Sequence, residues 1–207
     1  MGMRTVLIGC DDQYYQDWGI TLIQSLKHFV PWINIHCHIV NPNTYTPIDD
    51  VTYSMEQGNE STGYLQAVRF LKATDYANDN LMVIDADTIC TQSFTEDEFD
   101  KVCEGVNVLR HPKAPRWLCG LIASDNADFW HTYASCLETD TWVIGRDQDV
   151  LEDMTRHYTF KDCGPAWMKI GKPGNAVFQT LKGPQKQDPK YLKFYDNIKE
   201  QFSHQAV

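Results

Sequence analysis

The sequence lacks a long hydrophobic run, a cysteine-pair motif, repeats and a surplus of positive charge. No window approaches the roughly 20 apolar residues of a membrane-spanning helix. The apolar part of the segment 1–12 is too short for a signal peptide. The chain carries 18 lysines and arginines against 28 acids, a net charge of −10. An acidic chain repels nucleic acid and anionic membranes, so neither is expected as a general partner.

Cysteine use indicates a reducing compartment. The seven cysteines are odd in number, scattered, and never spaced as CxxC. Most lie in apolar or mixed segments, which is typical of small buried thiols. We therefore expect a cytoplasmic protein with free thiols rather than a disulfide-linked scaffold.

Length and composition fit one domain with its own core. The chain has 207 residues, of which 43% are hydrophobic and 12% aromatic, enough to build that core. We expect a single domain over 1–207, with a nucleotide-binding half at about 1–90 and an acceptor and donor-sugar half at about 91–207. The oligomeric state stays open.

Hydrophobic patterning alternates between strands and helices. The first part predicts strands at 4–10, 33–40 and 80–87, and helices at 14–30 and 61–77. Further along, the pattern predicts helices at 95–105, 126–139, 147–158 and 188–202, and strands at 106–112, 119–125 and 176–181. This alternation favours an α/β fold with a mainly parallel central sheet flanked by helices. Ligands bind at the carboxyl ends of strands in such sheets.

The stretch "LMVIDADTIC" ends a predicted buried strand in two acids, Asp85 and Asp87. Carboxylates are costly to bury unless something pairs with them. A solvated turn is the ordinary explanation. In an extended segment, however, both acids would point to one side with Ala86 opposite, which suits Mg²⁺ or Mn²⁺. The pattern hhhDxDxT also resembles the nucleophile motif of haloacid-dehalogenase-like phosphatases, although that motif normally lies on a first strand.

Four motifs in order carry a broader resemblance. These are "VLIGCDDQYYQDWGITLIQSL", "YLQAVRFLKATDYANDNLMVIDADTI", "CGLIASDNADFW" and "GRDQDVL". Over roughly residues 4–155 the chain resembles glycosyltransferase family 8, the galactosyltransferase and glycogenin-like group. The family's last motif usually continues with Asn where this chain has Glu152. The resemblance implies a GT-A (Rossmann-like) fold and a metal-dependent transfer of sugar from a nucleotide sugar.

The resemblance assigns the donor-binding residues. Asp85 and Asp87 would hold Mn²⁺ or Mg²⁺, with Asp87 the firmer ligand and Asp85 also able to reach the ribose. Asp11 and Tyr14 would recognise and stack on uracil, although the neighbouring Tyr15 is equally aromatic. Small residues at the end of the first strand, such as Gly9, would let the nucleotide approach the backbone.

Four further positions concern the donor sugar or the acceptor. Arg69 lies on an apolar helix and matches the family's donor-sugar arginine; a structural ion pair is the alternative. Asp147 and Gln148 match residues that touch the donor sugar near its anomeric carbon, and are the catalytic candidates. Ordinary helix capping is the alternative for these two. Gly120 would let a sugar approach the backbone closely.

The resemblance fails near the C-terminus. The family usually ends in H-x-x-G-x-x-K-P-W, whose His completes the metal shell and whose Lys holds the diphosphate. Here "WMKIGKPGNAVFQTLKGPQK" has no preceding His and a short spacing. We prefer Lys182 as the diphosphate ligand and leave the third metal ligand unassigned.

Several aromatic and imidazole side chains have simpler interpretations. His36 and His38 share one face of a predicted strand and are interpreted as edge residues rather than metal ligands. Trp117 and Trp167 fall in segments read as loops, where they would be able to stack on an acceptor sugar.

The expected function is therefore a glycosyltransferase using a nucleotide sugar, most simply a UDP-sugar, with retention of configuration. The acceptor, whether a glycan, a protein or a small molecule, is not indicated. Two alternatives stay open. One is a DxDxT-type phosphohydrolase, and the other is a non-catalytic nucleotide-sugar-binding relative.

Overall fold

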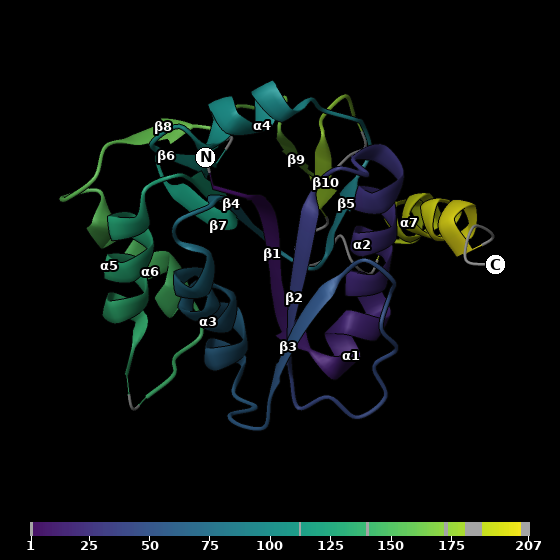
Figure 1. Ribbon diagram of the computed structural model, residues 1–207, viewed down its shortest axis with the longest axis horizontal. Coiled ribbons are helices and arrows are strands. Elements are labelled where there is room, and N and C mark those ends of the chain that lie inside the picture. Colours follow the sequence, from purple (N-terminus) through teal and green to yellow (C-terminus); the bar gives the residue numbers. More distant parts are fainter. Residues whose placement is uncertain (1, 112, 140, 172–173, 181–187, 204–207) are drawn as a thin grey trace.

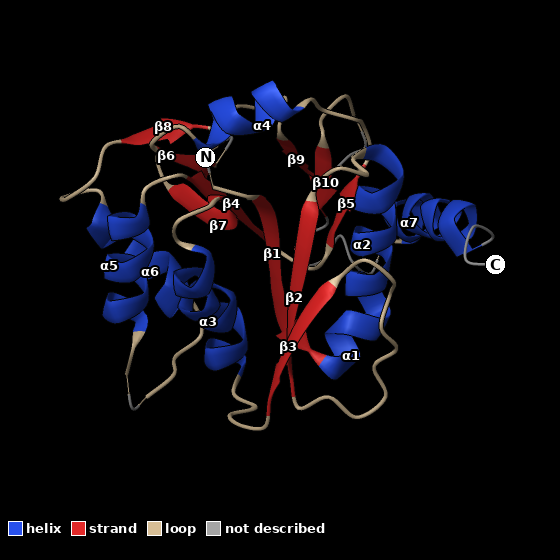
Figure 2. Ribbon diagram, viewed as in Figure 1, coloured by secondary structure: helices blue, strands red, loops and turns tan. Residues whose placement is uncertain are grey.

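The computed structural model describes residues 2–111, 113–139, 141–171, 174–180 and 188–203. A seven-stranded sheet forms the centre and helices cover it on both sides (Figures 1 and 2). The strands, in spatial order, are β3 (Thr52–Glu56), β2 (Asn34–Val40), β1 (Arg4–Asp11), β4 (Asn80–Ile84), β7 (Trp117–Ser124), β6 (Val106–Arg110) and β8 (Phe160–Asp162). The predicted α/β fold with a mainly parallel central sheet in one domain is confirmed.

The sheet is parallel except around one strand. Pairs β3–β2, β2–β1, β1–β4 and β6–β8 run parallel, whereas β7 runs antiparallel to both neighbours. Continuous apolar runs explain the central strands, because a strand covered on both faces has no solvent side. In β1, Val6 to Ile8 are completely buried. The reversal of β7 brings its first residues to the same edge as the ends of β1 and β4.

The helices divide the core into two layers. They are α1 (Asp12–Tyr14), α2 (Ile20–Phe29), α3 (Thr62–Lys72), α4 (Glu96–Cys103), α5 (Ala127–Leu137), α6 (Arg146–Met154) and α7 (Pro189–Ser203). On one face α2 packs Leu22 and Leu26 against the sheet. On the other face α3, α5 and α6 pack together, with Phe70, Trp130 and Leu151 among the buried residues. Figure 1 shows these two helix groups on opposite sides of β1 and β4.

A second, three-stranded sheet lies beside the main one. It consists of β5 (Thr88–Cys90), β10 (Phe178–Thr180) and β9 (Met168–Ile170), in that spatial order. Strand β5 follows β4 after a turn, so the small sheet begins directly beyond Asp87. Only β10 was predicted. A strand of three residues gives too short a pattern for alternation to be recognised.

Local sequence signals explain most helix starts. Ser61 accepts a hydrogen bond from the Tyr64 amide and caps α3. Asn126 accepts from the Phe129 amide and caps α5. The predicted helix 14–30 is confirmed, since residues 12–29 are helical without a break, but its segment Tyr15–Gly19 is a π-helical turn between α1 and α2. The last predicted strand residues, 85–87, form a turn and not an extended segment.

The two strand histidines belong to a hydroxyl cluster at the β2–β3 edge. His36 contacts Thr52 Oγ1 at 2.8 Å and Ser54 Oγ at 2.7 Å through its two ring nitrogens. His38 Nδ1 lies 2.7 Å from the same Ser54 oxygen. Burial lowers the pKa of His36 to about 4. The interpretation of these histidines as structural residues agrees with their contacts.

Membrane-spanning helices are absent from the part of the chain that the structure describes: none of its helices combines the length and apolar character required.

Gly9 provides a test of strand–helix packing. A methyl group added there would lie 2.7 Å from Arg69 Cβ and 2.9 Å from its Cα, in α3. We expect Gly9→Ala to lower the free energy of unfolding by about 1–3 kcal/mol through overpacking. Gly58→Ala, with no atom within 4 Å of its added methyl, is the control and should cost nothing. Denaturant unfolding measures both; equal stabilities would contradict the packing.

Acid should destabilise the β2–β3 edge. The folded-state pKa of His36 is about 4 instead of 6.5. Between pH 4 and pH 6.5, the His36 ring is therefore protonated in the unfolded chain and neutral in the folded chain. Stability present above pH 6.5 is then lost as the pH falls toward 4. We expect His36→Gln to lose less melting temperature than wild type between pH 7 and pH 5. The exposed His157→Gln should behave as wild type; identical losses in all three proteins would contradict the assignment.

Candidate functional site

A cavity of about 650 Å³ opens at the carboxyl edge of β1 and β4. Its walls come from several parts of the chain: the end of β1 with α1, helix α3, the turn after β4, the end of β6 and the turn that follows it, the start of β7, the start of α6, and β9. The charged and polar lining residues include Asp11, Tyr14, Gln66, Arg69, Asp85, Asp87, His111, Arg116, Asp147 and Gln148. All but one of the predicted site residues therefore line a single cavity.

Arg69 is the central charge of this cavity. It is 7% exposed, and its guanidinium lies 2.7 Å from Asp85 Oδ1 and 3.5 Å from Asp147 Oδ2. It also donates to the carbonyl of Cys119 at 3.4 Å. The side chain passes beside Gly9, where the missing Cβ leaves the room it needs. The glycine therefore serves helix packing at the position where the sequence suggested nucleotide approach.

Asp85 and Asp147 both pair with the Arg69 guanidinium, at a place with little access to solvent. Burial raises the pKa of Asp147, while the Arg69 charge and the Gln148 amide oppose that rise. The Gln148 amide donates to Asp147 Oδ1 at 2.9 Å. Arg69 has a raised pKa because its two acids outweigh desolvation. The guanidinium is thus held as a cation between two acids that need it.

Asp87 is held by a different set of contacts. Tyr14 donates its hydroxyl to Asp87 Oδ2 at 3.0 Å, and Thr180 donates to Asp87 Oδ1 at 3.2 Å. Only 4% of Asp87 is exposed. Burial, followed by the Asp87 charge, raises the pKa of Tyr14, which keeps its hydroxyl protonated. Tyr14 therefore ties α1 to the turn after β4.

The turn also corrects the expected geometry of the two acids. Asp85 and Asp87 were placed on one side of an extended strand with Ala86 opposite. The strand ends at Ile84, and all three residues line the cavity. A turn lets consecutive residues face the same space, which an extended segment does not.

The first-strand end is divided between cavity and core. Asp11 lines the cavity and caps α1 by accepting from the Tyr14 amide at 2.6 Å. Asp12 turns away and accepts from both the amide and the hydroxyl of Thr44. Tyr15 is fully buried in the core, so of the two neighbouring tyrosines only Tyr14 faces the cavity.

The α6 motif fixes the start of β7. Gln148 donates through Nε2 to the Trp117 carbonyl at 2.5 Å, and Glu152 accepts from the Trp117 amide at 3.0 Å. Glu152, which departs from the family pattern, thus has a structural partner. Gly145 precedes α6 with a φ of 83°, a conformation that favours glycine. Asp147 and Gln148 are presented to the cavity by this helix start.

The carboxylates of the cavity are the ligand type that a hard cation prefers, although few of them converge on one point. Carboxylate oxygens are the preferred protein ligands of Mg²⁺ and Mn²⁺, which also keep water and bind phosphate oxygens. Within the described ranges no group of three or more His, Cys, Asp or Glu side chains converges as a metal cluster. Two carboxylates from one turn, Asp85 and Asp87, fit an ion whose other ligands come from a diphosphate and solvent.

Some expectations fall elsewhere. Lys182, the proposed diphosphate ligand, lies outside the described residues. Trp117 begins β7 and packs edge-on against Phe160. Trp167 packs against Phe94 and Phe178. The prediction that these two tryptophans lie in loops is therefore wrong for Trp117 and confirmed for Trp167, which lies in a turn before β9. Stacking on an acceptor sugar stays a prediction.

The sequence reading missed the turn between β6 and β7. His111 and Arg116 from this turn line the cavity, and Lys113 lines a neighbouring one. The signal was available in "RHPKAPRW", where cations gather after a strand in an acidic chain. It was overlooked because no family motif covers it.

The sequence matches no family model and no curated protein sequence. The likeness to glycosyltransferase family 8 therefore stays a prediction that depends on the motifs.

Removing Arg69 should take away a cationic partner of the buried Asp147 and of the half-buried Asp85. We expect Arg69→Met to lower the free energy of unfolding by about 3–5 kcal/mol at pH 7. Arg156→Met is the matched control: that arginine is 77% exposed and pairs with Asp153 on the surface, so its loss should cost under about 0.5 kcal/mol. Urea unfolding gives both values. A loss at Arg69 no greater than the control's would contradict the buried ion triad.

Proposed function

We propose that the protein is a metal-dependent glycosyltransferase that uses a nucleotide sugar, with a UDP-sugar as the first candidate. One observation carries the proposal. Asp11, Tyr14, Arg69, Asp85 and Asp87 come from three separate segments and line one cavity with Asp147 and Gln148, at the sheet edge where α/β folds bind ligands. This is the set of positions that the family motifs assign to the donor.

The donor nucleotide would lie between the end of β1 and the turn after β4. The Asp11 carboxylate offers acceptors for base N–H groups, and the Tyr14 ring offers a flat apolar surface for stacking. Because Tyr14 also donates to Asp87 at 3.0 Å, base and diphosphate recognition are joined through one side chain. Substituting Tyr14 should therefore disturb both.

A divalent cation would be held by Asp87, with Asp85 beside it, and would neutralise the charge that grows on the departing diphosphate. Asp85 already pairs with Arg69 at 2.7 Å. Part of its charge is committed to that guanidinium, so Asp87 is the stronger ligand. This ordering agrees with the roles that the resemblance implies.

Asp147 and Gln148 would bind the donor sugar. The start of α6 directs both toward the cavity, and the Gln148 amide holds the Asp147 carboxylate in place at 2.9 Å. Arg69 keeps that carboxylate close to Asp85, and by resemblance Asp147 would lie beside the anomeric carbon of the donor. Retention of configuration is the expected outcome by resemblance.

The phosphohydrolase alternative draws less support from the geometry. In that chemistry Asp85 would attack phosphorus, yet its Oδ1 is paired with Arg69 at 2.7 Å, which lowers its nucleophilicity. Thr88, the last residue of the DxDxT pattern, is fully buried and does not line the cavity.

A cytoplasmic location agrees with seven free thiols, six of them buried.

Thermal unfolding with ligands tests the proposal. UDP and Mn²⁺ together should raise the melting temperature more than either alone, by roughly 5–10 °C at a hundredfold excess over Kd. Asp87→Asn should abolish the part of the shift that needs manganese. Asp153→Asn, an exposed acid at the far end of α6, is the control and should keep it.

Three other outcomes would each contradict the transferase. No shift with UDP and Mn²⁺ in a folded protein would refute nucleotide-sugar binding. Stabilisation by beryllofluoride with Mg²⁺, together with hydrolysis of an aryl phosphate, would indicate the phosphohydrolase. Stabilisation by UDP and Mn²⁺ without release of UDP from any nucleotide sugar would indicate the non-catalytic relative.

A further inference from the structure

A second cavity, of about 830 Å³, adjoins the first and carries the opposite charge. Its lining includes Arg110, Lys113 and Lys169 but a single acid, Asp162. The whole chain, in contrast, has 18 basic residues against 28 acids. A cationic hollow on an acidic protein attracts anions selectively, because the surrounding surface repels them.

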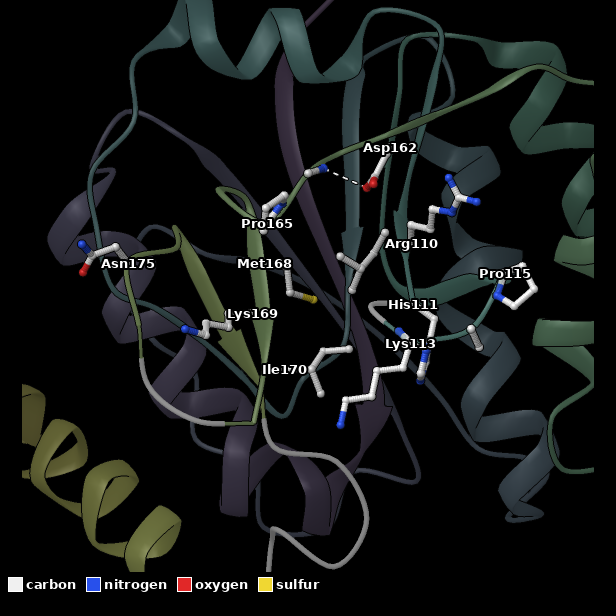
Figure 3. A pocket seen from close by; sticks show the side chains of 13 residues that line it. Arg110, His111, Lys113, Pro115, Asp162, Pro165, Met168, Lys169, Ile170 and Asn175 are labelled. Carbon is white, nitrogen blue, oxygen red and sulfur yellow. Dashed lines mark hydrogen bonds between the residues drawn. The ribbon is translucent and has the colours of Figure 1, made fainter.

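The cavity combines an apolar floor with a cationic rim. Met168 and Ile170 of β9 form one side, and His111 and Lys113 from the β6–β7 turn form the other (Figure 3). Figure 3 also shows Lys169 directed outward, toward Asn175. Sugar rings present both apolar C–H faces and polar substituents. Such a floor accommodates the ring face while the rim contacts the substituent.

Among the described residues, no protein acid neutralises the cations of this lining. No carboxylate there forms an ion pair with Arg110, Lys113 or Lys169. The only acid of the lining, Asp162, accepts from the Gly164 amide at 2.9 Å, drawn as the dashed line in Figure 3. Lys169 is directed outward, so Lys113 is the lysine whose charge is available for a ligand in the cavity.

The turn that carries these cations is held in shape. The His111 amide donates to the Arg116 carbonyl at 2.9 Å, and the Lys113 amide donates to His111 Nδ1 at 3.0 Å. Arg110 lies over the Trp117 ring, 5.8 Å from its centroid. A preorganised turn loses less conformational entropy on ligand binding than a flexible turn does.

The two cavities are neighbours. Leu109, His111 and Ile170 line both, and the Arg116 carbonyl, which accepts from the His111 amide at 2.9 Å, belongs to a residue that lines the acidic one. A ligand in the second cavity would therefore lie next to the cavity that holds the carboxylates around Arg69. The second substrate of a transfer reaction needs a position of this kind, beside the donor.

We infer that the second cavity binds the acceptor, and that the acceptor is a sugar bearing an anionic substituent, a carboxylate or a phosphate ester. This inference deepens the proposed transferase function and rests on it. The acidic cavity would take the cation and the nucleotide sugar. The basic cavity would select the acceptor by charge, with Lys113 as its main contact.

Binding of simple sugars tests the inference without turnover. The probes are glucuronate, glucose 6-phosphate and glucose, added to protein labelled with ¹³C at its methionine methyl groups. Met168 lies in the cavity floor, whereas Met82 lies in the core of the sheet. We expect one or both anionic sugars to shift the Met168 signal and not the Met82 signal, and glucose to shift neither. The probe that binds distinguishes a carboxylate from a phosphate.

Charge-reversal variants complete the test. Lys113→Glu should weaken binding of the anionic sugar at least about tenfold, as expected for loss of a charge-assisted contact. Lys193→Glu, an exposed lysine on α7, is the control and should bind as wild type. Glucose binding as well as the anionic sugars, no shift at Met168 with any probe, or full affinity in Lys113→Glu would overturn the inference.

The outcome is separable from that of the proposed function. Stabilisation by UDP and Mn²⁺ without anionic-sugar binding would leave the transferase standing and remove its anionic acceptor. Anionic-sugar binding at Met168 without any effect of UDP and Mn²⁺ would establish the basic cavity as an anion site and refute its place in a transfer reaction.

Discussion

The ion pairs of Arg69 with Asp85 and Asp147 organise the whole site. They join α3, the turn after β4 and the start of α6, which are otherwise distant in the sequence. A buried arginine needs acids, and buried acids need a cation, so none of the three is stable in this place alone. Because Gly9 has no Cβ, the α3 backbone at Arg69 can lie close to β1. The positions of Asp85 and Asp147 in the cavity therefore follow from one side chain, whereas Asp87 is held by Tyr14 and Thr180.

The two neighbouring cavities at this edge of the sheet carry opposite charge. The first cavity gathers Asp11, Asp85, Asp87 and Asp147, and the lining of the second includes Arg110 at the end of β6, Lys113 of the β6–β7 turn and Lys169 of β9. A transfer from a nucleotide sugar needs a cation beside the leaving diphosphate and a separate place for the acceptor. The opposite charges of the two cavities give each substrate a distinct environment, and the shared wall at His111 brings them together.

The small sheet explains why Asp87 is fixed so firmly. Strand β5 begins at the next residue and pairs with β10, whose Thr180 donates to Asp87 at 3.2 Å. Tyr14 holds the same carboxylate from the opposite side of the cavity. A ligand atom bound at Asp87 would thus be positioned by two independent elements, α1 and β10, and not by a free turn.

Much of the fold was predictable because its signals are local. Apolar runs marked β1 and β4, and an alternating pattern marked β2. The positions of most candidate residues at one sheet edge followed from parallel strand ends. Other features depend on tertiary contacts and were not predictable. The three-residue strands exist only through their pairing, the partners of Arg69 come from remote segments, and the π turn at Tyr15–Gly19 has no distinct pattern.

The most direct test is a crystal structure with UDP and Mn²⁺, in which manganese is located by its anomalous scattering. The account predicts one strong peak within about 2.5 Å of an Asp87 oxygen, with the uracil against Tyr14 and Arg69 still joining Asp85 to Asp147. Manganese bound elsewhere, or a nucleotide ordered outside this cavity while Asp87 keeps only its protein contacts, would contradict it.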